Sequence, residues 1–332
     1  MDKYKDFGFS DTKEMLKDAY DNRYAIPSLN YITEEQLNAI IDAILENNSP
    51  TIIMVSPKHC RQFETGMLVR MAQAGVERLR QCKNNSPVAL HLDHGTTFEE
   101  CKLAIDSGFS SVMIDGSRLS LEDNITLTKK VVDYAHPRGV AVEGEVGALS
   151  GFEDLDEKQE GPIVENIFTD PEDAKLFMER TGADCLAVSV GTIHGLNKSI
   201  ADNLNFSGLR YDIIRRIEEL APDFPLVLHG CSALPEKYVK MFRQYNGKME
   251  TTVGVPDENI MKASKMAVCK INIASDGWIP STAITRKVLA EHPEVIDSRL
   301  YREIIRKELK PIYQHKMDIC GSSMKTTARQ GG

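Results

Sequence analysis

Residues 88–95 read Val-Ala-Leu-His-Leu-Asp-His-Gly. This apolar run ends in charged residues and a glycine, which is typical of a parallel strand that is buried on both faces and stops at an open end of its sheet. Seven more segments have a similar apolar character. The predicted strands are Ala25–Asn30, Thr51–Ser56, Val88–Asp93, Ser111–Asp115, Val140–Val146, Cys185–Val190, Leu226–His229 and Cys269–Ala274.

The segments between these strands repeat apolar residues at helical spacing. Asp170-Pro171, for example, puts a capping residue before a proline at the first helical position. Strand and helix alternate for eight rounds, which favours an α/β fold of the (β/α)8 TIM-barrel type over an open doubly wound sheet. The predicted helices are Thr33–Glu46, Thr65–Gln81, Phe98–Ser107, Leu121–His136, Pro171–Thr181, Leu209–Leu220 and Glu236–Tyr245.

Four segments stand outside this alternation. Residues 148–168 and 191–207 are too long for ordinary strand-to-helix loops, and we expect the first, which is acidic, to form a mobile lid. Residues 297–317 are predicted to form an additional C-terminal helix, and residues 321–332 a loosely ordered tail. We expect the whole chain, 1–332, to be a single barrel domain.

Composition excludes several classes of function. The 332 residues carry a net charge of −9 without any Lys/Arg block, which argues against a nucleic-acid partner. No apolar run is long enough to span a membrane, and the N-terminus is unlike a signal peptide. The seven cysteines are odd in number and show no CxxC spacing, so we expect reduced thiols in a cytoplasmic protein.

Three histidines fall at the ends of predicted strands: His94, His194 and His229. The carboxyl ends of barrel strands converge on one mouth, and three histidines with an open fourth position form a typical catalytic zinc site. A single histidine beside a strand would more often belong to the core or the surface. Gly195, Gly230 and Ser232 follow two of these histidines and could present N–H and O–H donors to a phosphate, although a lone glycine more often marks a tight turn.

Carboxylates lie at the same strand ends. Asp93 and His94 are adjacent, so both can reach the mouth only if the strand ends or bulges there. An aspartate beside a metal stays ionised and suits a general base acting on a hydroxyl, or else it anchors a histidine. Asp115 and Glu145 could bind a second metal or form hydrogen bonds within the barrel mouth.

The motifs at these strand ends resemble class II fructose-bisphosphate and tagatose-bisphosphate aldolases, and the resemblance extends from Thr12 to about Ser323. The motifs are His91-Leu92-Asp93-His94-Gly95, Glu143-Gly144-Glu145-Val146-Gly147, Gly191-Thr192-Ile193-His194-Gly195 and Leu228-His229-Gly230-Cys231-Ser232.

The resemblance implies reversible cleavage of a phosphorylated ketose to dihydroxyacetone phosphate and an aldehyde, in a homodimer or homotetramer. It implies zinc on His94, His194 and His229, and a second divalent ion or a monovalent cation near Asp115 and Glu145. Asp93 would exchange a proton with the C4 hydroxyl, and Glu153 would handle the proton at the enediolate carbon. The implied substrate-binding positions are Asn30, Ser56, Gly195, Lys198, Gly230, Cys231, Ser232, Asn272, Ile273, Ala274 and Ser275.

Two positions depart from the fructose-bisphosphate pattern, which has Asp at 274 and, at 278, an Arg that reaches across the subunit interface toward the distal phosphate. This chain has Ala274, as tagatose-type members do, and Trp278. The distal group of the substrate could therefore differ: a tagatose bisphosphate, a ketose 1-phosphate, a keto-sugar acid phosphate or a sulfo-sugar phosphate. Alternatively, Arg118 or Lys58 supplies the missing cation. A metal-dependent hydrolase and a non-catalytic sugar-phosphate binder are the competing functions.

Overall fold

The computed structural model describes residues 3–147, 168–192, 208–249 and 254–326. Its strands form a closed parallel barrel in which each strand pairs with the next along the chain and the last pairs with the first. This confirms the predicted TIM barrel. The strands are β1 (Ile26–Asn30), β2 (Thr51–Val55), β3 (Val88–Gly95), β4 (Ser111–Ile114), β5 (Ala141–Val146), β6 (Cys185–Val188), β7 (Leu226–Leu228) and β8 (Val268–Ile273).

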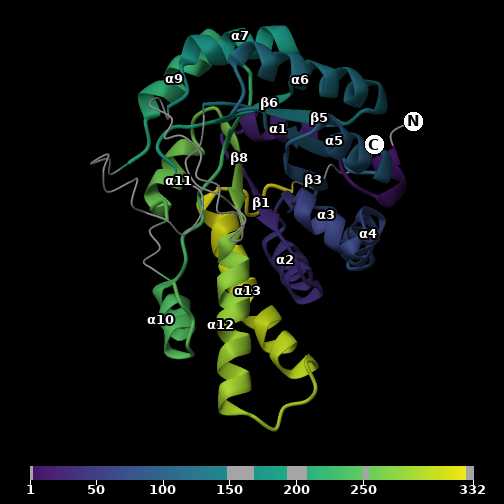
Figure 1. Cartoon of the computed structure of the whole chain (residues 1–332), viewed down its shortest axis with the longest axis vertical. Helices are drawn as coiled ribbons and strands as arrows, with labels where there is room; N and C mark the ends of the chain where they lie inside the picture. The colour runs from purple at the N-terminus through teal and green to yellow at the C-terminus, as the bar shows by residue number, and fades with distance from the viewer. Residues whose placement is uncertain (1–2, 148–167, 193–207, 250–253, 327–332) are drawn as a thin grey trace.

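Helices surround the barrel (Figure 1). Local signals explain many of their starts: Thr33 and Gln36 form a capping box, and the Asp170 carboxylate accepts from two backbone N–H groups. The helices are α1 (Thr12–Asp21), α2 (Glu34–Asn47), α3 (Pro57–Phe63), α4 (Thr65–Gln81), α5 (Phe98–Ser107), α6 (Leu121–Ala135), α7 (Pro171–Thr181), α9 (Tyr211–Leu220), α10 (Glu236–Gln244), α11 (Asp257–Ala263), α12 (Ser275–Glu291) and α13 (Arg299–Ile319), with short 3-10 turns η1 (Lys3–Phe7) and η2 (His136–Arg138).

Among the described elements, the helices that the sequence did not predict are α1, α3, α11 and α12. Helix α12 is the longest of these four helices. It directly follows β8, so it begins at the barrel mouth. Its early residues include Gly277 and Pro280, which both disfavour a helix when local sequence is considered alone. Tertiary packing against α10 and α13 supports the helix instead.

The additional C-terminal helix is confirmed as α13, which packs on α12 and α2 and extends with α12 away from the barrel (Figure 1). The tail, residues 321–332, was expected to be loosely ordered, and the structure describes it as far as residue 326. Met324 N–H donates to the carbonyl of Asn47, and the Thr326 hydroxyl donates to Asn48. Backbone and hydroxyl groups therefore tie residues 321–326 to the end of α2.

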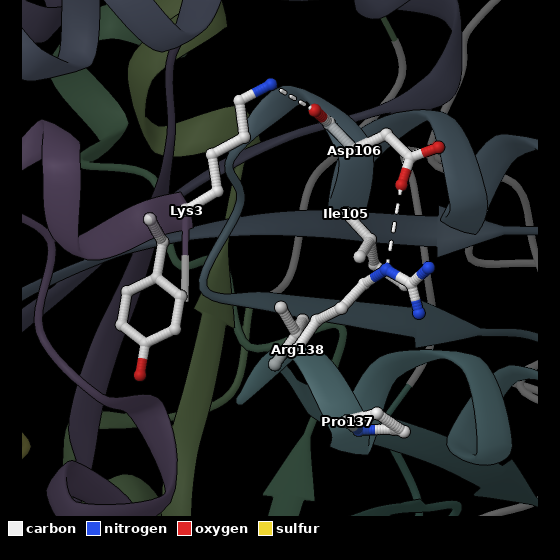
Figure 2. A pocket seen from close by; sticks show the side chains of 7 residues that line it. Lys3, Ile105, Asp106, Pro137 and Arg138 are labelled. Carbon is white, nitrogen blue, oxygen red and sulfur yellow. Dashed lines mark hydrogen bonds and ion pairs between the residues drawn. The ribbon is translucent and has the colours of Figure 1, made fainter. Parts of the chain in front are cut away.

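The N-terminal segment contacts the end of the barrel opposite the mouth: the Ser10 N–H donates to the carbonyl of Val88 at the start of β3, and the Thr12 hydroxyl donates to Ser110, just before β4. Figure 2 shows a hollow of this region in which Lys3 contacts the carbonyl of Asp106, whose carboxylate lies 3.9 Å from Arg138. The hollow is lined by both apolar and charged residues, namely Lys3, Tyr4, Ile105, Asp106, Pro137, Arg138 and Val140, and its ion pair, Arg138 with Asp106, is partly exposed. Within the described ranges, no helix has the length and apolar character that a bilayer span requires.

Candidate active site

A bulge in β3 brings Asp93 and His94 to the mouth together. Leu92 pairs with Val112 and Gly95 with Ile114, so β3 has one more residue than β4 between these pairs. His94 accordingly has a φ of 49°, in the left-handed region that non-glycine residues seldom adopt. The bulge interrupts the usual alternation of strand side chains, so the adjacent residues Asp93 and His94 can both reach the mouth.

His94 and His229 face each other across the mouth. Nε2 of His94 lies 2.9 Å from Nδ1 of His229, and their rings meet edge to face at 77°. An oxygen of Asp93 completes a cluster whose three candidate ligand atoms all lie within 4.8 Å of one another. The structure thus brings together two of the three predicted zinc histidines and the predicted base.

The far nitrogen of each ring contacts a carboxylate. Nδ1 of His94 lies 3.0 Å from Oδ2 of Asp115, and Nε2 of His229 lies 2.8 Å from Oε1 of Glu143. An ionised carboxylate only accepts hydrogen bonds, so each of these ring nitrogens carries the proton. In neutral rings the two nitrogens that face each other then both present lone pairs. A cation shared by both nitrogens would remove their repulsion, so the donor set fits a metal.

Electrostatics keep His229 neutral. Its complete burial lowers the pKa to about 4, although the hydrogen bond to Glu143 opposes this shift. For Asp115, burial alone would raise the pKa, but hydrogen bonds from His94 and Ser117 lower it well below its usual value. A neutral imidazole and an ionised carboxylate are the forms in which these groups bind metals.

Asp115 also belongs to a second candidate cluster with His94 and Glu145. The Ser117 hydroxyl donates to Oδ1 of Asp115 over 2.7 Å, while Oε2 of Glu145 lies 4.0 Å from Nδ1 of His94. In this structure Asp115 orients His94. The arrangement accords with both predicted roles of the pair, as a further metal site or as hydrogen-bonding groups in the mouth, and that choice stays a prediction.

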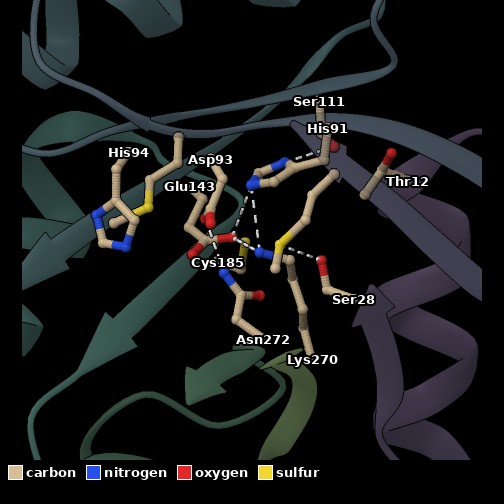
Figure 3. A network of polar contacts seen from close by, with 12 residues as sticks. Thr12, Ser28, His91, Asp93, His94, Ser111, Glu143, Cys185, Lys270 and Asn272 are labelled. Carbon is tan, nitrogen blue, oxygen red and sulfur yellow. Dashed lines mark hydrogen bonds and ion pairs between the residues drawn. The ribbon is translucent and has the colours of Figure 1, made fainter. Parts of the chain in front are cut away.

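Glu143, the partner of His229, belongs to a buried charge network that was not assigned a role from the sequence (Figure 3). Oε2 of Glu143 accepts from Lys270 Nζ over 2.7 Å, and this Nζ lies 3.2 Å from Nε2 of His91. All three side chains are 1% exposed. Burial alone would raise the pKa of Glu143, but Lys270 and the hydrogen bond from His229 lower it well below normal. The available signal was a Glu and a Lys inside apolar strand segments, where charges are rarely buried unless they are paired.

Asn272, at the end of β8, connects the base to this arrangement. Its Nδ2 donates to Oδ1 of Asp93 over 2.7 Å and lies 3.4 Å from the ring nitrogens of His229. Asp93 and Asn272 are both buried. The amide therefore fixes the orientation of the carboxylate next to the two histidines.

The loop after β7 contains two of the predicted phosphate-binding residues, Gly230 and Ser232. Gly230 has a φ of 66°, and the Ser232 hydroxyl accepts from the backbone N–H of Ala274 over 3.2 Å, which joins this loop to the end of β8. Ser275 follows as the first residue of α12. The side chains of Cys231 and Ile273 are buried, so within the described structure their contribution to ligand binding would come from the backbone.

Asn30 and Trp278 meet at the β1–β8 side of the mouth. Trp278 Nε1 donates to Oδ1 of Asn30 over 2.9 Å, so the indole is held against the end of β1. Ser56, another predicted substrate-binding residue, caps α3, where its hydroxyl accepts from the N–H of His59. Four predicted site residues lie outside the described residues: Glu153, His194, Gly195 and Lys198.

The family model described as fructose-bisphosphate aldolase class-II matches residues 10–325. The chain belongs to this family. A fructose-bisphosphate aldolase of Treponema pallidum is 42% identical, with 97% of this chain and 99% of the relative covered. One of Giardia intestinalis is 39% identical, with 90% of each covered. The crystal structure of the YdjI aldolase from Escherichia coli K12 superposes with a TM-score of 0.72 at 27% identity, covering 96% of this chain and 100% of that chain.

Membership in the class II fructose-bisphosphate aldolase family confirms the predicted family, the barrel and the enzyme class, a carbon–carbon lyase of glycolytic sugar metabolism. It favours an aldolase over the competing hydrolase. The individual residue roles, the ion and the exact ketose stay predictions.

Proposed function

We propose that this class II aldolase cleaves a ketose bisphosphate or a related ketose phosphate between C3 and C4, with zinc bound by His94, His229 and His194. The observation that supports this most strongly is the 2.9 Å approach of the His94 and His229 nitrogens, each backed by a carboxylate, with Asp93 in the same cluster. When bound, zinc would act as a Lewis acid on the oxygens at C2 and C3 of the ketose.

Asp93 is the general base of this proposal. It removes the proton of the C4 hydroxyl, the C4–O electrons form the aldehyde carbonyl, and the C3–C4 bond breaks with its electron pair left on the dihydroxyacetone half. The hydrogen bond from Asn272 keeps the carboxylate in place for this transfer. Glu153, which the resemblance places in the 148–168 segment, delivers a proton to C3 and completes dihydroxyacetone phosphate.

The phosphate on the dihydroxyacetone half binds the loops after β6, β7 and β8. Gly230, Ser232 and Ser275 contribute from the described loops, with N–H and O–H donors of the kind that anions bind. Gly195 and Lys198 are assigned to the same phosphate. This half of the site retains the family pattern.

The other end of the substrate has a changed environment. Trp278 donates its indole N–H to Asn30 and offers a ring where the fructose-bisphosphate pattern has a guanidinium, and an indole cannot form a bidentate pair with a phosphate. Together with Ala274, this favours a tagatose bisphosphate, a ketose 1-phosphate, a keto-sugar acid phosphate or a sulfo-sugar phosphate. In the alternative, Arg118 or Lys58 contacts a distal phosphate.

A panel of these ketose phosphates, tested on zinc-loaded enzyme with a coupled triose-phosphate readout, decides between the substrates. We expect chelator to abolish cleavage and added zinc to restore it. Fructose 1,6-bisphosphate as by far the best substrate would contradict the changed distal end. Full zinc occupancy with no cleavage of any member would favour a sugar-phosphate binder, and cleavage that survives removal of divalent metal would overturn the proposal.

We further propose that the enzyme acts in the cytoplasm as a homodimer or homotetramer. The family's place in glycolytic sugar metabolism supports the compartment, and the resemblance supports the assembly. Light scattering coupled to size-exclusion chromatography tests the assembly, and a monomer at micromolar concentration would contradict it.

A further inference from the structure

A buried ion pair lies next to the phosphate-binding loops but outside the metal cluster. Asp276, in the first turn of α12, and Lys316, near the end of α13, are 0% and 1% exposed. Lys316 Nζ lies 3.5 Å from Oδ1 of Asp276. Buried ion pairs often stabilise a fold less than apolar residues of the same size would. Stability alone therefore does not explain why charged residues occupy these two buried positions.

Both residues of the ion pair form hydrogen bonds with the backbone of Ala233, in the loop after β7. The backbone N–H of Ala233 donates to Oδ2 of Asp276 over 3.1 Å, and the carbonyl of Ala233 accepts from Lys316 Nζ over 3.4 Å. The peptide groups on both sides of Ala233 are therefore each fixed by a hydrogen bond to a buried charged side chain. The neighbouring residue, Ser232, is in turn bound to the backbone of Ala274.

The ion pair thus sets the path of a short loop. Ser232 lies one residue before Ala233, and Gly230 lies three residues before it with a φ of 66°. A glycine leaves the loop free to take other conformations, so the orientation of its N–H groups depends on restraints farther along the chain. The restraint at Ala233 comes from α12 and α13.

We propose that Asp276 and Lys316 are positioning residues that fix the loop Gly230–Ala233 in its phosphate-binding conformation, which makes the C-terminal helix α13 part of the binding site. This inference rests on the proposed function, in which that loop binds the phosphate of the dihydroxyacetone half. Neither side chain touches the substrate. Their contribution is to remove conformations of the loop that bind phosphate poorly.

Kinetics of Lys316→Met test the proposal. A positioning role predicts that KM for the preferred ketose phosphate and the inhibition constant of inorganic phosphate both rise about tenfold, while kcat changes by less than about threefold. Lys316→Arg, which keeps the charge and the donors, should return both constants most of the way to the wild-type values. The matched control is Lys310→Met, on the same helix, because Lys310 pairs with Glu46 at the surface.

Stability is monitored in parallel because Lys316→Met leaves Asp276 buried and unpaired. If this variant does not fold, Asp276→Asn with Lys316→Met leaves no buried charge and carries the same test. Wild-type KM and phosphate inhibition in a folded variant would overturn the positioning role, as would an equal change in Lys310→Met. If the wild-type enzyme cleaves no ketose phosphate but binds inorganic phosphate in a Lys316-dependent way by calorimetry, the proposed function fails while the positioning role stands.

Discussion

Nε2 of His94 and Nδ1 of His229 lie 2.9 Å apart, although the two residues are 135 positions apart in the chain and come from opposite sides of the barrel, at β3 and just beyond β7. Asp115 and Glu143 hold the outer nitrogens of the two rings, so the inner nitrogens are directed at each other. Preorganisation of this kind lowers the cost of assembling a metal site.

Removal of either ring should release the metal. We expect His229→Ala and His94→Ala to lose most of the bound zinc, as measured by elemental analysis of dialysed protein, and to lose cleavage with it. His292→Ala is the control, because His292 is exposed and pairs with Glu294 at the surface. Zinc stoichiometry that equals the wild type in His229→Ala would rule out His229 as a ligand.

Experiments can distinguish a role of Asp93 in proton transfer from a role in metal binding. Asp93→Ala should lower kcat by about 10²–10⁴, the usual contribution of general acid–base catalysis, with zinc content retained. The alternative role, an anchor for a histidine, predicts instead that zinc affinity falls and that excess zinc restores turnover. Titration with a zinc chelator of known affinity, alongside kcat at saturating zinc, discriminates the two.

The buried network gives a prediction for stability. Lys270→Met leaves the Glu143 carboxylate buried without its cation, which should lower the free energy of unfolding by about 3–5 kcal/mol in urea denaturation. Lys287→Met removes an exposed pair with Glu291 and should cost less than about 1 kcal/mol. A second change, Glu143→Gln, should recover much of the loss from Lys270→Met. Equal effects of the two lysine variants would contradict this view of the network.

The sequence predicted the barrel well because its strands are short and apolar and alternate with segments of helical periodicity, and because polar residues recur at strand ends such as Asp93-His94. It predicted that the strand must either end or bulge there, since adjacent strand residues otherwise point to opposite faces. It did not predict the partners of those residues. Lys270 is one charged residue within an apolar segment, and only the closed barrel shows that it meets Glu143 and His91.

Helix α12 was also missed, because Gly277 and Pro280 disfavour a helix in the local sequence while tertiary packing stabilises it. The ion pair of Asp276 and Lys316 was equally inaccessible, because it joins residues that only the packing of α13 brings together. Local patterns therefore located the reactive groups, and the long-range contacts that orient them required the folded structure.

Acid should weaken the attachment of α13 to α2. Asp42 on α2 accepts hydrogen bonds from Arg306 on α13 and Arg78 on α4. Burial raises the pKa of Asp42, but these arginines outweigh it and the pKa is lowered overall. A lowered folded-state pKa means that the stabilisation is complete above the unfolded value, about 3.9, and is lost as the pH falls through the folded value.

Asp42→Asn should therefore lower the free energy of unfolding at pH 7 by roughly 1–3 kcal/mol, with the difference from wild type shrinking below about pH 4. Urea denaturation between pH 3 and pH 7 measures it. Asp21→Asn is the control, since Asp21 forms an exposed pair with Lys17 within α1. A difference that stays constant across this range would show that the ionisation of Asp42 is not responsible.

Trp278 should decide which end group the enzyme accepts. Trp278→Arg places a guanidinium on the first turn of α12 and should raise kcat/KM for fructose 1,6-bisphosphate relative to a ketose 1-phosphate, by about tenfold for one added charge-assisted pair. The substitution also removes the indole N–H that donates to Asn30. Trp278→Phe controls for that loss, because it keeps an aromatic ring without the donor or the cation. If Trp278→Arg and Trp278→Phe shift the ratio equally, the change comes from releasing Asn30, and the distal phosphate is then recognised by another cation such as Arg118 or Lys58.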